Sequence, residues 1–184
     1  STTTLGIPAG TGLPPHCVRE VVGVLKAYST RVGAGPFPTE LTDATGDRIR
    51  ERGREYGTTT GRPRRCGWLD LVAVRYAAMV NGVTSLSVML FDVLAGFDEL
   101  RVCTAYEFEG GRTDRFLPDA ADLERVAPVY ETHPGFAEEI TGARTLDELP
   151  ATARRYLDRI EEFVGVPIGI VSVGPDRAQT IRCG

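Results

Sequence analysis

The chain has 184 residues, a mass of 19.9 kDa and a formal net charge of −4 at pH 7. Hydrophobic residues make up 42% of it, a value typical of one globular domain rather than of a disordered or fibrous protein. The acidic balance argues against general nucleic-acid binding, which needs a basic surface. Since no apolar run approaches the ~20 residues of a membrane span, we expect neither nucleic acid nor a membrane as a partner.

The first part of the chain is predicted to contain one helix between two irregular segments. Residues 1–15 are rich in Thr, Gly and Pro, which is typical of an irregular loop. Apolar residues then recur at helical spacing and predict a helix over 16–28 that begins near Pro15: Val18, Val21, Val22 and Leu25. Glycine and proline dominate 33–38, so we expect a shaped loop there.

The rest of the chain shows helical and strand-like patterns in alternation. Helices are predicted over 70–80 and 151–164, the second one ended by Gly165. Strands are predicted over 85–91, 101–108, 128–132 and, as the last element, 166–173. This alternation favours an α/β fold.

The most unusual stretch is 57–68, which reads GTTTGRPRRCGW. Its glycines allow the backbone to approach a ligand closely, and its threonines offer hydroxyl and amide donors. Arg62, Arg64 and Arg65 follow within four residues, and guanidinium groups pair with carboxylates or phosphates through two parallel hydrogen bonds. The stretch therefore predicts an anion-binding loop, with a solvated basic turn as the alternative.

Two strand ends are further candidates for a binding site. Asp92 follows the apolar run that starts at Ser85, and ligands of α/β proteins bind at the carboxyl ends of strands. An aspartate that only caps a helix or turn is the alternative. Near the end of the chain, 171–177 reads VSVGPDR and could present Ser172 and backbone donors to a ligand, or could be a plain exit from a strand.

The sequence lacks the common phosphate-loop, dinucleotide and zinc-protease motifs. Neither His16 nor His133 lies in a motif, so we predict no catalytic residue in this chain. The four cysteines form no CxxC pair, so we predict neither a metal site nor a disulfide framework. Reduced thiols fit a cytoplasmic protein.

Three stretches together resemble one known family: 25–41, which reads LKAYSTRVGAGPFPTEL, then 57–68 and 171–177. Their order and spacing closely resemble the carboxyl-terminal part of the adenylosuccinate synthetases, and the similarity extends over about 6–182. The resemblance implies the carboxyl-terminal part of a mixed-sheet α/β fold like that of the P-loop NTPases. We expect 1–184 to be this portion alone, as a fragment or one piece of a split enzyme, without the amino-terminal catalytic half.

The family is a carbon–nitrogen ligase of purine nucleotide and AMP biosynthesis. It couples IMP and L-aspartate, with hydrolysis of the co-substrate GTP, to give adenylosuccinate, GDP and phosphate. The γ-phosphoryl group moves to O6 of IMP, and the aspartate amine then displaces the phosphate. The resemblance places the catalytic residues, the phosphate loop and the Mg²⁺ ligands in the amino-terminal half, so we expect this chain alone to be inactive. It also implies a cytoplasmic homodimer for the full-length enzyme.

Carried over position by position, the resemblance names three groups of binding residues. The aspartate-binding residues form a segment that we call the Thr–Arg loop: Thr58, Thr59, Thr60, Gly61, Arg62, Pro63 and Arg64. IMP would be approached by Arg62 and by Val32, at the start of the Val32–Pro38 loop, which would approach the bound monophosphate. GTP would be contacted by Arg64, Phe91, Asp92, Ser172, Val173 and Gly174.

The sequence departs from the family where guanine is recognised. The family reads Thr-Lys-x-Asp, whereas this chain reads Met89-Leu90-Phe91-Asp92, so the aspartate remains and the threonine and lysine do not. Leu90 offers apolar contact but no charge. Two alternatives therefore stand beside the ligase: a non-catalytic, regulatory nucleotide-binding relative, and a ligase with another phosphate donor such as ATP.

Overall fold

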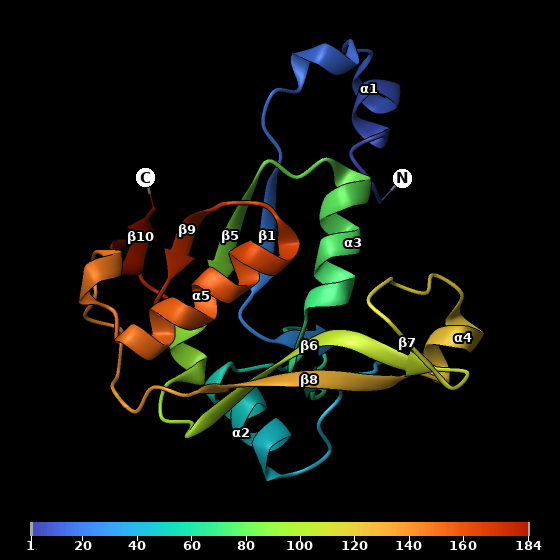
Figure 1. Cartoon of the computed structure of the whole chain (residues 1–184). Coiled ribbons are helices and arrows are strands. Elements are labelled where there is room, and N and C mark those ends of the chain that lie inside the picture. Colours follow the sequence, from blue (N-terminus) through green and yellow to red (C-terminus); the bar gives the residue numbers. More distant parts are fainter. Residues whose placement is uncertain (1, 184) are drawn as a thin grey trace.

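Helices and strands alternate along the residues that the computed structural model describes, 2–183 (Figure 1). The α-helices are α1 (Gly6–Thr11), α2 (Ala44–Arg52), α3 (Leu71–Asn81), α4 (Ala120–Glu124) and α5 (Ala151–Val164). The 3-10 helices are η1 (Pro15–Cys17), η2 (Phe91–Leu94), η3 (Leu146–Glu148) and η4 (Arg177–Gln179). The strands are β1 (Val22–Lys26), β2 (Ser29–Arg31), β3 (Arg65–Gly67), β4 (Leu69–Asp70), β5 (Ser85–Met89), β6 (Glu99–Phe108), β7 (Gly111–Thr113), β8 (Ala127–Pro134), β9 (Ile168–Ser172) and β10 (Thr180–Arg182).

The first sheet has the order β1-β5-β9-β10, in which β1, β5 and β9 are parallel and β10 is antiparallel to β9. Helices α3 and α5 lie side by side across one face of it (Figure 1). α5 presents a buried stripe at intervals of three and four residues: Ala153, Tyr156, Leu157, Ile160 and Val164. Its C-cap is Gly165, in the left-handed conformation. None of the helices in residues 2–183 combines the length and the apolar character that a membrane span requires.

A second sheet is built around the long strand β6, which pairs in parallel with β4 and antiparallel with β7 and β8. β2 and β3 form a separate antiparallel pair, with Arg31 opposite Arg65. Helix α2 contacts β3. The pair therefore joins the segment that follows β1 to the end of the Thr–Arg loop.

Tyr156 connects the layers of the core. Its side chain is fully buried, and its hydroxyl donates to the carbonyl oxygen of Ala27, 2.8 Å away. Its ring stacks on Phe91 at a centroid distance of 5.9 Å, and Phe91 in turn contacts Phe136 at 5.1 Å. The segment after β5 is thus fixed from both sides before Asp92 follows it.

Most of the longer predicted elements are confirmed. The predicted helices correspond to α3 and α5, and three predicted strands correspond to β5, β6 and β8. The shaped loop over 33–38 is also confirmed, with Gly33 and Gly35 at positive φ. The strand over 166–173 corresponds to β9, but it is not the last element because β10 follows.

The helix predicted over 16–28 is wrong. The structure has η1, beginning at Pro15, followed by the edge strand β1. The valines that share a helical face also suit a strand, because β-branched side chains favour the extended backbone, and parallel pairing with β5 decides between the two. The irregular segment predicted over 1–15 contains α1.

We predict that Gly67→Ala destabilises the fold. A Cβ at Gly67 would overlap the carbonyl oxygen of Thr39, which accepts a hydrogen bond from the Trp68 amide. Forcing such an overlap open costs about 2 kcal/mol or more. At Gly169 the nearest atom to a new Cβ is 3.8 Å away, so Gly169→Ala serves as the control. Urea unfolding of both variants is the measurement, and equal free energies of unfolding would contradict the prediction.

Candidate functional site

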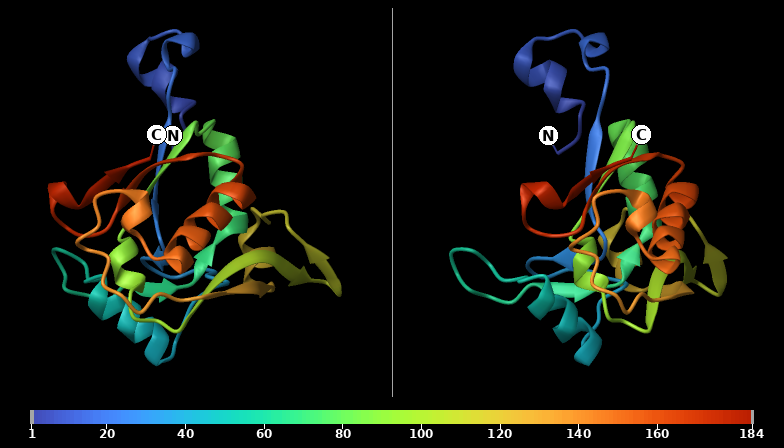
Figure 2. Two further views of the ribbon diagram at one scale, coloured as in Figure 1. Left: turned by 60° about the vertical axis from the view of Figure 1, so that its left-hand side comes forward. Right: turned by 90° about the vertical axis from the view of Figure 1, so that its left-hand side faces the viewer.

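The Thr–Arg loop is exposed along most of its length and projects from the body of the molecule (Figure 2). Backbone hydrogen bonds close its base, from the Gly57 amide to the Arg62 carbonyl (2.9 Å) and from the Gly61 amide to the Gly57 carbonyl (2.8 Å). Gly61 has φ +64°, which the tight turn requires and a glycine accepts without strain. The threonine side chains are therefore presented to solvent on a turn with a defined backbone.

The three arginines of this stretch differ in how many of their donors are used. Arg65 pairs with Glu40 through two hydrogen bonds of 2.8 and 2.5 Å. Arg64 donates from one nitrogen, Nη1, to Glu55 at 2.8 Å. The guanidinium of Arg62 has no hydrogen-bond or ion-pair partner among residues 2–183. Arg62 and Arg64 thus keep donors for an anion, whereas Arg65 has a structural role.

Arg65 also fixes the neighbouring loop over 33–38. Its Nη1 donates to the carbonyl oxygens of Gly33 (3.2 Å) and Gly35 (2.8 Å). The same guanidinium holds the pKa of Glu40 below its ordinary value through their hydrogen bonds. Val32, predicted to approach IMP, stands just before this loop and is 78% exposed. The loop over 33–38 is therefore anchored to Arg65, the residue that directly follows the Thr–Arg loop.

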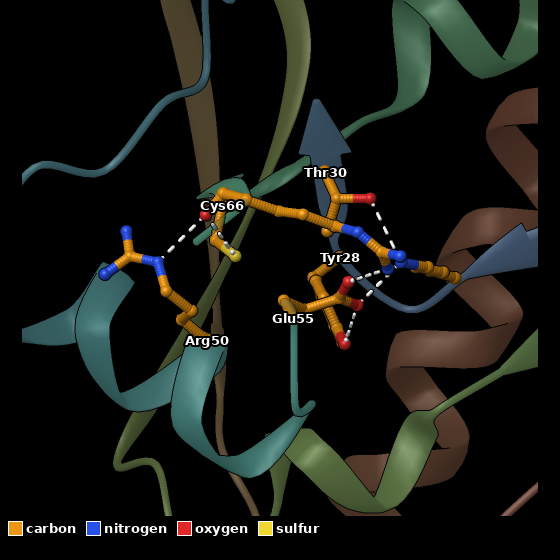
Figure 3. A network of polar contacts seen from close by, with 7 residues as sticks. Tyr28, Thr30, Arg50, Glu55 and Cys66 are labelled. Atoms are coloured by element: carbon orange, nitrogen blue, oxygen red, sulfur yellow. Dashed lines mark hydrogen bonds and ion pairs between the residues drawn. The ribbon is translucent and has the colours of Figure 1, made fainter. Parts of the chain in front are cut away.

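A buried carboxylate holds the end of the Thr–Arg loop (Figure 3). The Glu55 side chain is 1% exposed. Its Oε1 accepts from Lys26 Nζ and from the Tyr28 hydroxyl, each at 2.6 Å, and its Oε2 accepts from Arg64. Burial raises the pKa of Glu55, but the hydrogen bonds from Lys26, Tyr28 and Arg64 outweigh it, so the net pKa lies below its ordinary value. Glu55 is therefore a buried anion with three donors.

Sequence reasoning missed Glu55 altogether. The available signal was Lys26, the chain's single lysine, which stands at the end of an apolar run and needs an acidic partner if it is buried. Nothing in the sequence identifies that partner, because 29 positions separate the two residues.

Helix α2 supports the base of the Thr–Arg loop. Asp43 caps its start by accepting from the amides of Thr45 and Gly46. Near its end, Arg50 Nε donates to the Arg64 carbonyl oxygen at 2.8 Å (Figure 3). The Arg64 amide in turn donates to the Glu55 carbonyl, also at 2.8 Å. Backbone and side-chain contacts therefore both hold Arg64 against the end of this helix.

Asp92 lies directly after β5, in η2. The preceding Leu90 has φ 58°, an uncommon conformation for a bulky residue that turns the chain sharply. One carboxylate oxygen, Oδ1, is buried and has no hydrogen-bond partner among the described residues. Burial raises the pKa of Asp92 above its ordinary value. A buried acceptor without a donor is costly, so this oxygen is a candidate for contact with a ligand.

The predicted segment 172–174 lies at the same edge of the sheet as Asp92. β5 and β9 are parallel neighbours, so their carboxyl ends lie together, and β9 contacts η2. Ser172 is buried, and its hydroxyl donates to the Gly174 carbonyl at 2.9 Å. Val173 is fully buried, with its amide donating to the Gln179 carbonyl. The Phe91 ring is buried in the core, so only its backbone remains for the predicted contact with GTP.

The end of helix α2 connects the two groups of candidate residues. Arg52 Nη2 donates to the Asp92 carbonyl oxygen at 3.0 Å, and Glu55 follows Arg52 by three residues. The end of α2 therefore lies between Asp92 and Arg64. Five surface hollows with volumes of about 360 to 650 Å³ are lined by other residues. Residues 2–183 contain no group of three or more His, Cys, Asp or Glu able to hold a metal ion.

The fold is mixed α/β, and Asp92, with its unpartnered Oδ1, lies at the carboxyl edge of parallel strands, which is where α/β proteins bind their ligands. The family assignment is more specific. The family model described as adenylosuccinate synthetase matches residues 1–181, and the chain belongs to this family.

Curated relatives and solved structures agree with this assignment. The adenylosuccinate synthetases of Alkaliphilus metalliredigens and Desulforudis audaxviator are 53% and 55% identical over 179 residues, each match covering 97% of this chain and 42% of the relative. The fully ligated adenylosuccinate synthetase of Plasmodium falciparum matches with a TM-score of 0.95 and 38% identity, covering all of this chain and 44% of that one. The chain thus spans about two fifths of the length of these relatives.

A more distant structure shares the fold alone. The succinoaminodeoxyadenylate synthetase of cyanophage S-2L, bound to dGMP and to dATP as an energy donor, matches with a TM-score of 0.53 and 20% identity. The match covers 98% of this chain and 38% of that one.

We predict that Glu55 makes the stability of the chain sensitive to acid. Because the pKa of Glu55 is lower in the folded state than its ordinary value of about 4.3, its contribution is present above that pH and is lost as the pH falls through the folded pKa. The stability difference between the parent and Glu55→Gln should therefore shrink as the pH falls below about 4. Urea unfolding from neutral to acid pH measures it. For the exposed Glu138→Gln no such change is expected, and a constant difference for Glu55→Gln would contradict the prediction.

Proposed function

We propose that this chain supplies the aspartate loop and the guanine-side contacts of an adenylosuccinate synthetase. The complete enzyme ligates L-aspartate to IMP with hydrolysis of GTP. The observation that carries the proposal is the unequal use of three neighbouring arginines. Arg65 is fully engaged within the fold, while Arg62 and Arg64 keep donors free on an exposed loop.

L-Aspartate is a small dicarboxylate, and its chemistry suits this loop. Each carboxylate accepts two parallel hydrogen bonds from a guanidinium, which fixes its orientation as well as its position. Arg62 would clamp the aspartate carboxylates near IMP, and Arg64 would lie between aspartate and GTP. The hydroxyls of Thr58, Thr59 and Thr60 add neutral donors. The aspartate amine is then held where it can attack C6 of the O6-phosphorylated IMP, so that the new C–N bond forms as the C6–O6 bond breaks and the phosphate leaves with O6. This gain comes from positioning.

The guanine contact in this proposal belongs to Asp92. Its carboxylate accepts from the N1–H and the exocyclic amine of guanine, and its buried Oδ1 has no donor of its own among residues 2–183. Ser172 and Gly174 would line the same base. Leu90 replaces the family lysine and can contribute apolar contact only, so we expect guanine affinity to be weaker than in relatives that keep the lysine.

We assign the remaining parts of the reaction to the portion of the relatives' length that this chain does not match. The ligands of Mg²⁺ are part of this assignment. The catalytic residues, the homodimer and the cytoplasmic location implied by the family belong to the same proposal. On this basis, the chain alone binds ligands at most weakly and catalyses nothing.

Arg62→Leu should impair aspartate use selectively. Losing a charge-assisted hydrogen bond weakens binding by about tenfold or more, so the apparent KM for aspartate should rise by at least that factor while the KM for GTP changes little. Steady-state kinetics of the complete enzyme, reconstituted from this chain and the amino-terminal portion of a relative, provide the measurement. Arg112→Leu, at an exposed arginine on β7, is the control. Parental aspartate kinetics in Arg62→Leu would refute the role of the loop.

A nucleotide titration distinguishes the proposed guanine contact from the alternative in which ATP is the phosphate donor. The alternative is motivated by Met89 and Leu90, which replace the family Thr and Lys. We expect the reconstituted enzyme to bind GTP more tightly than ATP, and Asp92→Asn to reduce this preference. Equal affinities for the two nucleotides in the parent would favour the altered-donor ligase.

Complementation separates the ligase from a non-catalytic relative. The chain combined with a folded amino-terminal portion should form adenylosuccinate from IMP, L-aspartate and GTP, while neither part alone should do so. Absence of product with both parts folded and associated would favour a regulatory nucleotide-binding role.

A further inference from the structure

The Arg64 guanidinium is bound within the fold through one of its three nitrogens. Only Nη1 is committed, to Glu55 Oε2 at 2.8 Å, while Nε and Nη2 make no hydrogen bond to residues 2–183. The side chain is 31% exposed. The Nε–Nη2 edge is one of the two edges through which arginine grips a carboxylate or phosphate with two parallel bonds. The contact with Glu55 therefore orients the group and leaves a complete binding edge available.

Glu55 is itself fixed from its other oxygen. Lys26 and Tyr28 both donate to Oε1, at 2.6 Å each, and Lys26 Nζ also donates to the Thr30 hydroxyl at 3.1 Å. Oε2 is thus left to Arg64 alone (Figure 3). A carboxylate locked by two donors on one oxygen is a rigid support for what its second oxygen holds.

The net charge of the cluster formed by Lys26, Glu55 and Arg64 favours the binding of an anion. Lys26 and Arg64 are both cationic and share the single negative charge of Glu55, so the cluster keeps one net positive charge at the base of the Thr–Arg loop. Had Glu55 paired with Arg64 alone, the pair would be neutral. Lys26 therefore offsets the buried carboxylate and leaves the charge of Arg64 available to a ligand.

We propose that Glu55 is a positioning residue for Arg64, and that it holds the free edge of that guanidinium toward the bound anionic substrate. The inference rests on the proposed role of Arg64 in binding aspartate and GTP. Glu55 does not touch the substrates; it acts through Arg64. Arg65 shows the contrasting arrangement, since Glu40 occupies its bidentate edge and leaves it no such role.

The test is a double-mutant cycle between Glu55 and Arg64 in the complete reconstituted enzyme. Glu55→Gln keeps the shape of the side chain and removes its charge. We expect it to raise the apparent KM for aspartate or GTP by about tenfold, with a smaller change in kcat. In an Arg64→Ala background the same substitution should change KM by less than about twofold, because the residue through which it acts is gone. Glu55→Asp, which keeps the charge, should recover part of the loss.

A matched variant separates positioning from a general loss of stability. Glu131→Gln breaks another glutamate–arginine pair, with Arg159, and should lower the melting temperature without raising either KM. If Glu55→Gln raises KM equally with and without Arg64, or lowers only the melting temperature, the inference is overturned. If Arg64→Ala alone leaves both KM values unchanged, the proposed role of Arg64 fails first and the inference fails with it.

Discussion

The candidate site depends on one buried carboxylate that is shared by two cations and a phenol. An isolated carboxylate in the interior would be neutralised or excluded, so the 1% exposure of Glu55 requires the donors that surround it. These donors come from β1, from the segment before β2 and from the end of the Thr–Arg loop. The ionic cluster therefore joins three parts of the chain that share no continuous secondary structure.

Helix α2 is the element through which the separate candidate groups are related. Arg50 holds the backbone at Arg64, and Arg52 holds the backbone at Asp92. α2 is short and polar, and its buried residues are Gly46 and Ile49, so it contributes little to the hydrophobic core. Its cap at Asp43 and its arginines give it a different function, because they fix loops on either side of it.

The sequence predicted best where the local pattern was strong. The amphipathic stripe of α5 and the apolar run of β5 were both readable without tertiary information, as was the loop over 33–38. The prediction of a helix at β1 is wrong because the spacing of its valines fits both the helical repeat and the two-residue repeat of a strand. Only the pairing of β1 with β5 decides between helix and strand. The Thr–Arg loop was recognisable from its composition. Glu55 was not, because its importance comes from partners distant in sequence.

In the proposed guanine contact, the chemistry of Asp92 constrains which base can fit. An ionised carboxylate only accepts hydrogen bonds, so its buried and unpaired Oδ1 calls for a donor on the ligand. Guanine presents two adjacent donors on its Watson–Crick edge, N1–H and the exocyclic amine. Adenine presents one donor beside the N1 lone pair, which would face the second carboxylate oxygen unfavourably. In this proposal, Leu90 in place of the family lysine would lack a contact along the base but would leave this pattern of donors and acceptors unchanged, so the proposed preference for guanine depends on Asp92.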